Sequence, residues 1–287
     1  RLLYAALPKG ERVPLPPISV RFVDFAAWEY ALLKKGQLRH QILYWQKQLS
    51  VRAPVINFRK TSRRQTKRTF GTSTQNFAID GSLLKNLRTF AGEHSCTVFI
   101  ALLAALNVSL YRRTGQTDIR IAAAVANRSQ REIEATVGYL INAVILRTQI
   151  SANMRFIDLM TDLRECAIGA FSNQDLPIGR LARELKRGCR RQSRKPLFQV
   201  MFVYKTLVFP NIEQVGLKFV SSDGIFRKAP IAMTLSEADL FFDIFELSTK
   251  LTGSLTYKTA AIDDEDAAKL LEDVVETIKQ IVDDPNC

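Results

Sequence analysis

The sequence predicts an α/β fold in which a mixed sheet with flanking helices follows a helical connection. Several segments repeat apolar residues at spacings of three and four, which is typical of amphipathic helices. Short runs rich in β-branched and small residues lie between these segments and favour strands. The chain has 287 residues, of which 47% are hydrophobic and 24% charged, so it can bury a sizeable core.

The N-terminal part predicts a linker followed by two helices. Residues 1–17 are rich in proline, which removes backbone donors and restricts the preceding residue, so no regular helix is expected there. Residues 22–49 carry a helical apolar pattern that is interrupted near Gly36. The two tryptophans of this pattern, Trp28 and Trp45, lie on its apolar stripes and are expected in the core.

The middle of the chain predicts alternating strands and helices. Residues 72–79 favour a strand that ends in the turn Asp80-Gly81. Next come a helix at 83–90, a helix from the N-cap Thr97 to about Arg113, strands at 119–126 and 140–146, and helices at 156–171 and 178–185. The run at 140–146 is so uniformly apolar that its periodicity alone does not exclude a helix.

Strands dominate the C-terminal part until a last helix. The predicted strands are residues 197–204, 216–220, 232–235, 240–247 and 253–258. A helix at 263–282 closes the chain, and its acidic DDED start suits the positive end of the helix dipole.

Composition argues against several classes of protein. The four cysteines lack CxxC spacing, so ordinary reduced thiols are expected rather than a disulfide framework or a metal site. The longest apolar run, residues 98–110, is too short to span a bilayer, and no signal segment opens the chain. We therefore expect a cytoplasmic protein without a membrane partner.

The net charge of +13 is concentrated in two basic runs, residues 59–68 and 183–195. Each is either a solvated loop or a contact surface for nucleic acid phosphates or an acidic protein. Neither run interleaves aromatic residues with its basic ones, as single-strand binding would favour. Nucleic acid is therefore not the expected partner, and an acidic protein ranks above it.

Five stretches carry a resemblance to a known family, and they occur in a fixed order. They are residues 22–28 (FVDFAAW), 124–128 (AVANR), 137–148 (VGYLINAVILRT), 173–178 (NQDLPI) and 193–204 (SRKPLFQVMFVY). Together they resemble the C-terminal half of a nonribosomal peptide synthetase condensation domain. Any one stretch alone would be a weak signal, whereas their shared order and spacing make the resemblance specific.

The resemblance implies a fold and an activity. Condensation domains have two lobes similar to chloramphenicol acetyltransferase, with a tunnel between them, and they join two carrier-bound thioesters into an amide. The match implies that residues 1–70 are a linker and helical connection and that residues 71–287 are the C-terminal lobe. Peptidyl or acyl carrier proteins and the N-terminal lobe are then the partners. No cofactor binds this chain directly, because phosphopantetheine arms on the carriers deliver both substrates.

The family's working histidine lies in an HHxxxDG motif, which this chain lacks. Its only histidines are His40 and His94, and neither has a histidine neighbour or a following DG. No GxSxG elbow or phosphate-binding glycine loop offers another catalytic arrangement. We therefore expect no catalytic residue in this chain and no activity from it alone.

The family pattern points to two candidate site residues. Arg128 falls on the arginine of the ANR motif, which looks like the partner of the aspartate of HHxxxDG across the lobe interface. The alternative is an exposed arginine after a strand. Asn142 falls on an asparagine that faces the tunnel in the family, where an amide can donate to and accept from a thioester. The alternative is an asparagine that satisfies backbone groups in a bend.

The chain also departs from the family pattern. Asn173 replaces the usual histidine, Ile178 and Gly179 replace a Phe-Glu pair, and Ala232 stands in place of an aspartate. These changes leave open whether the site is degenerate or belongs to an ordinary subfamily.

The second basic run also differs from the family, which has a more acidic stretch there. We expect Arg187, Arg190 and Arg191 in this run to attract acidic carrier proteins.

Two functions remain open. The leading one is the C-terminal lobe of a condensation domain, which supplies one wall of the tunnel and part of the carrier-docking surface. The alternative is a noncatalytic module that binds carriers or pairs with another lobe. An HHxxxDG motif encoded upstream would favour the first, and the start at Arg1 rather than methionine suggests missing upstream residues.

Overall fold

The computed structural model describes residues 6, 10, 17–49, 55–58, 71–187, 196–206 and 238–284. Its centre is a six-stranded sheet with the strand order β1-β6-β5-β4-β2-β3. The strands are β1 (Thr72–Ile79), β2 (Asp118–Val125), β3 (Asn142–Gln149), β4 (Val200–Thr206), β5 (Leu240–Glu246) and β6 (Leu251–Lys258). Strand β4 pairs in parallel with β2 and β5, and the other pairs are antiparallel, which confirms the predicted mixed sheet.

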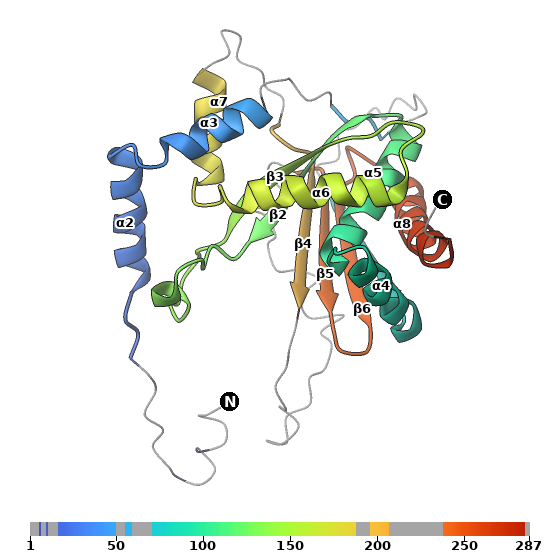
Figure 1. The fold of residues 1–287 in the computed structure, drawn as a ribbon, viewed down its shortest axis with the longest axis horizontal. Helices are drawn as coiled ribbons and strands as arrows, with labels where there is room; N and C mark the ends of the chain where they lie inside the picture. The colour runs from blue at the N-terminus through green and yellow to red at the C-terminus, as the bar shows by residue number, and fades with distance from the viewer. Residues whose placement is uncertain are drawn as a thin grey trace.

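Four helices form the layer that packs on this sheet: α4 (Gly81–Glu93), α5 (Val98–Thr114), α6 (Phe156–Phe171) and α8 (Asp264–Asp283). Helix α6 contacts β3, α8 contacts β1 and β6, and α5 lies between α6 and α8 (Figure 1). The ring of Phe99 on α5 packs against Phe202 and Tyr204, which point to the same face of β4. The interior of α5 is almost wholly buried, so this helix forms the centre of the core.

The helix ends follow from local sequence signals. The Thr97 hydroxyl accepts a hydrogen bond from Ile100 N and caps α5, as predicted. Gly115 ends the same helix in the left-handed region at φ 68°, which glycine adopts without strain. Asp80 does not form the predicted turn. Its carboxylate accepts from Leu83 N and caps α4, because a short side chain with an oxygen there satisfies a free helix donor.

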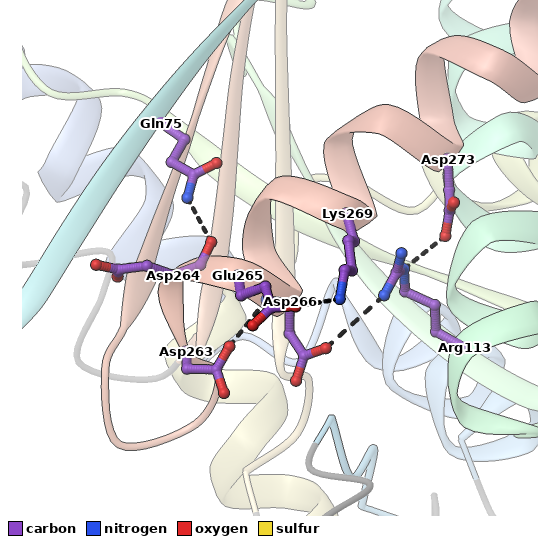
Figure 2. A network of polar contacts seen from close by, with 8 residues as sticks. All are labelled: Gln75, Arg113, Asp263, Asp264, Glu265, Asp266, Lys269 and Asp273. Carbon is purple, nitrogen blue, oxygen red and sulfur yellow. Dashed lines mark hydrogen bonds and ion pairs between the residues drawn. The ribbon is translucent and has the colours of Figure 1, made fainter.

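The acidic start of α8 is the centre of a polar network (Figure 2). Asp263 caps the helix by accepting from Asp266 N at 2.8 Å, and Gln75 on β1 donates to the carbonyl of Asp264 at 2.6 Å. Arg113, near the C-terminal end of α5, forms an ion pair with Asp273 at 2.5 Å. The network therefore ties α8 to both the edge strand and the central helix.

Helices α2 (Phe22–Lys34) and α3 (Arg39–Gln48) confirm the predicted pair, and Gly36 lies between them at φ 71°. Leu38 and Trp45 place α3 in the main core, beside α7 (Ile178–Arg187) (Figure 1). Helix α2 stands apart from the sheet and buries only Phe25. The division near residue 70 remains a prediction.

Two expectations for the N-terminal helices had different outcomes. Trp45 is 2% exposed and lies in the core as expected, but Trp28 is 40% exposed, so its assignment to the core was wrong. The apolar stripe of α2 has only a small partner surface in the described residues, which leaves this ring accessible.

Some predicted elements cannot be compared with the structure. The predicted linker at 1–17 and strands at 216–220 and 232–235 fall on residues that lie largely or wholly outside the described ones. In the part of the chain that is described, no single helix is long and apolar enough to cross a membrane.

Candidate functional site

The structure gathers the family-like stretches on the β3-β2-β4 side of the sheet. Stretch 124–128 includes the end of β2, and stretch 137–148 includes all but the last residue of β3. The described part of the last stretch, residues 196–204, includes most of β4, and these three strands are neighbours. Stretch 173–178 connects α6 to α7 next to β3, and 22–28 forms most of the first two turns of α2. Segments that are far apart in the sequence thus form one region, the motif region.

Arg128 fixes a turn that follows β2. Its Nη1 donates to the carbonyls of Ile133 at 2.8 Å, Glu134 at 3.0 Å and Thr136 at 2.8 Å. Asn127, just before it, adopts φ 52°, a left-handed conformation that asparagine tolerates better than most residues. The half-buried arginine therefore organises its own loop, and its expected pairing with an aspartate of another lobe remains a prediction.

Residues 131–140, which include this turn, contact α2, and we call them the cradle. The hydroxyl of Thr136 donates to Val20 O at 2.8 Å, just before α2 begins. Phe25 packs with Ile133 and Leu140 in a small hydrophobic cluster separate from the main core. The ring of Phe22 lies so close to Gly138 that a side chain there would collide with it. Because Arg128 binds carbonyls of the cradle, it supports the position of α2 indirectly.

The cradle and α2 expose large apolar side chains. They are Phe22, Val23, Trp28 and Tyr30 on α2, and Val137, Tyr139 and Ile141 on the segment that enters β3. Val137 alone is 77% exposed. We call this set the apolar wall, because a monomeric protein rarely leaves so many large apolar side chains on two adjacent elements exposed.

Asn142 begins β3 and is 8% exposed. Its Nδ2 donates to Gln174 O at 2.7 Å and to Leu176 O at 3.0 Å, and its Oδ1 accepts from Ile178 N at 3.0 Å. Of the two roles considered for this residue, the structure shows the one in which the amide satisfies backbone groups. Its place on a tunnel wall remains a prediction.

Gln41 is a residue of this region that the sequence reasoning missed. Its side chain is buried, donates from Nε2 to Asp175 Oδ2 at 2.9 Å and accepts at Oε1 from Leu176 N at 2.9 Å. Trp45, one turn further along α3, donates from Nε1 to Asn173 O at 2.9 Å. The sequence does contain a signal for this residue: a glutamine lies within the apolar stripe of the predicted helix. An amide buried there needs a specific hydrogen-bond partner.

Gln199 performs a similar task in the last stretch. Its Oε1 accepts from Ile56 N at 2.5 Å, and its Nε2 donates to Ile56 O at 3.1 Å and to Asp239 Oδ2 at 3.0 Å. The amide therefore holds segment 55–58 alongside the start of β4. Three of the family-like stretches therefore each contribute a polar side chain that binds backbone groups: Arg128, Asn142 and Gln199.

Both histidines and two of the four cysteines lie in the described part of the chain. His40 is exposed on α3, and the Nδ1 of His94 lies 2.8 Å from Phe90 O. Cys96 and Cys166 are free thiols, and burial raises the pKa of Cys166 above its ordinary value. Within the described residues, no three histidine, cysteine or carboxylate side chains cluster as metal ligands would.

The expected carrier-docking arginines cannot be placed. Helix α7 ends at Arg187, whose side chain lies outside the described residues, as do Arg190 and Arg191. The other basic run, residues 59–68, also lies outside them. Docking through these arginines remains a prediction.

Curated proteins with similar sequences are peptide synthetases. The chain is 32% identical over 286 residues to a subunit of linear gramicidin synthase from Brevibacillus parabrevis, covering 100% of this chain and 5% of that protein. It is 30% identical over 279 residues to cyclosporin synthetase of Tolypocladium inflatum, covering 97% of this chain and 2% of that protein. The chain therefore spans only a few per cent of the length of these relatives.

Solved structures share the fold. The condensation domain of the monacolin K polyketide synthase MokA superposes with a TM-score of 0.79 at 18% identity, covering 98% of this chain and 65% of that one. The X-domain from teicoplanin biosynthesis, solved in complex with OxyB, superposes with a TM-score of 0.74 at 20% identity, covering 99% and 63%. A sequence model described as "Condensation domain" matches residues 1–287. The chain therefore belongs to the condensation domain family of nonribosomal peptide synthetases.

Proposed function

We propose that this chain is the C-terminal lobe of a condensation domain that joins two carrier-bound thioesters into an amide. The observation that carries the proposal is the motif region, where three of the five family-like stretches lie on the neighbouring strands β3, β2 and β4. The apolar wall supports the half-domain interpretation, because its large apolar side chains are exposed beside that region.

The proposed reaction is attack by an acceptor amine on the carbonyl carbon of a donor thioester. A C–N bond forms, the C–S bond breaks, the amine loses a proton and the departing thiol gains one. Phosphopantetheine arms of carrier proteins present both groups, and orienting them accounts for much of the rate. A histidine of an HHxxxDG motif, which this sequence lacks, would orient or deprotonate the amine.

Arg128 fits a place at the border between two lobes. In the described part of the chain, its hydrogen bonds all come from Nη1. The rest of the guanidinium is thus available to hold a carboxylate from the partner lobe in a bidentate or charge-assisted contact.

The test compares residues 1–287 with the complete protein that its native gene encodes. Each is incubated with one aminoacyl-loaded donor carrier and one loaded acceptor carrier, and intact-protein mass spectrometry detects a dipeptidyl carrier. We expect product from the complete protein and none above background from residues 1–287. Product formed by residues 1–287 alone would refute the half-domain assignment.

Carrier docking has its own test. In the proposed function, Arg187, Arg190 and Arg191 attract the acidic surface of a carrier from a distance. Their joint replacement by serine should slow association at low ionic strength, with little change at high ionic strength, because salt screens such attraction over about 10 Å. Association that is unaffected by the substitutions and by salt would identify the run as a solvated loop.

A second function is a noncatalytic interaction module, and the apolar wall is the observation that favours it. The X-domain, which shares this fold, was solved in complex with another protein, OxyB. In this case the complete native protein would bind a loaded carrier or another lobe and still form no dipeptide. Binding measured together with product formation therefore separates the two functions.

A further inference from the structure

One residue of the α6–α7 connection is held on both sides by side chains from different elements. The N–H of Leu176 donates to Gln41 on α3, and its carbonyl accepts from Asn142 on β3. This gives a continuous chain of hydrogen bonds from α3 through Leu176 to β3. The two amides also bind the neighbouring residues, Gln41 through Asp175 and Asn142 through Gln174 and Ile178.

The amide of Asn142 is fully engaged as a donor in this arrangement. Nδ2 has two hydrogens, and it donates to two carbonyls, those of Gln174 and Leu176. A substrate carbonyl at Asn142 would have to displace one of these bonds and leave a backbone oxygen unpaired. Such displacement costs free energy, because a buried polar group without a partner loses its hydration.

We propose that Gln41 and Asn142 are positioning residues that lock residues 173–178 and the start of α7 in place. The inference rests on the proposed function for its link to the reaction, and it gives Asn142 a role that needs no contact with substrate. Because the locked segment joins α6 to α7 beside β3, its position sets the shape of the motif region.

The chemistry of Gln41 suggests a specific test. Gln41 donates to a carboxylate and accepts from an N–H at the same time, and an ionised carboxylate in its place could only accept. Gln41→Glu places a second carboxylate against Asp175, where two like charges repel. Combining it with Asp175→Asn exchanges the two groups, so that the introduced carboxylate accepts from both the introduced amide and Leu176 N. The double substitution should therefore restore the hydrogen bonds that hold residues 173–178 in place.

The experiment compares the complete native protein with Gln41→Glu, Asp175→Asn and their combination. Gln48→Glu, an exposed position on the same helix, is the matched control for the added charge. The first measurement is hydrogen exchange at the amides of Leu176 and Ile178. We expect exchange at least about tenfold faster in Gln41→Glu, near-normal exchange in the double variant and no change in the control.

The second measurement is kcat for dipeptide formation at a temperature where all variants are fully folded, so that a purely stabilising role would leave kcat unchanged. We expect kcat to fall in Gln41→Glu and to recover in the double variant. Normal kcat or normal exchange in Gln41→Glu would overturn the inference, as would failure of the double variant to recover. Absence of product from the unaltered protein would refute the proposed function instead, and the exchange pattern would then decide whether the lock exists.

Discussion

Replacing Asn142 by leucine removes one side chain that holds three backbone groups. Leucine has nearly the same branched shape, so the change deletes polar contacts with little change in volume. The carbonyls of Gln174 and Leu176 and the N–H of Ile178 lose their partner. At roughly 1 kcal/mol for each hydrogen bond, we expect the free energy of unfolding to fall by about 3 kcal/mol, and by more where water does not replace the amide.

The assay is equilibrium unfolding in urea, followed by circular dichroism. Gln149→Leu is the matched control, because this residue lies on the same strand and its side chain is exposed. We expect the control to stay within about 0.5 kcal/mol of the unaltered protein. If Asn142→Leu is as stable as the control, the three hydrogen bonds do not hold the segment and the reasoning fails.

Two further perturbations probe the cradle and a helix cap. A Cβ on Gly138 would lie 2.5 Å from Cδ2 of Phe22, so Gly138→Ala should weaken the docking of α2 by about 1–3 kcal/mol and speed hydrogen exchange in α2. Gly92→Ala is the control, because open space surrounds that position. Equal exchange in the two variants would contradict this reasoning. The pKa of Asp80 is lowered from its ordinary value, first by the hydrogen bond from Leu83 N and then by the neighbouring serine hydroxyl. Its ionised cap therefore stabilises α4 above about pH 4, and this contribution is lost as the pH falls through the lowered pKa. Asp80→Asn should remove this part of the acid sensitivity, and unfolding curves with the same pH dependence in both proteins would refute it.

Local patterns in the sequence predicted most of the described elements. The helix at 156–171 has the predicted bounds, and α5 begins after Thr97 as predicted and ends at Thr114, one residue beyond the predicted end near Arg113. Capping residues and apolar periodicity act within one or two turns, so they can be read without the rest of the chain. Strand β3 begins at Asn142 rather than at residue 140, because Leu140 packs with Phe25 in the small cluster below α2.

The sequence by itself determined the family and the two residues to examine, Arg128 and Asn142, because the order of five short stretches is a property of the sequence alone. Only the tertiary structure decided what these side chains bind, and only it showed Gln41, whose partner Asp175 lies 134 positions away. It also distinguished the buried Trp45 from the exposed Trp28. Both lie on an apolar stripe of a helix, but the two stripes differ in what packs against them. A spacing rule fixes which face of a helix is apolar, but the partner of a buried amide or ring depends on segments that only folding brings together.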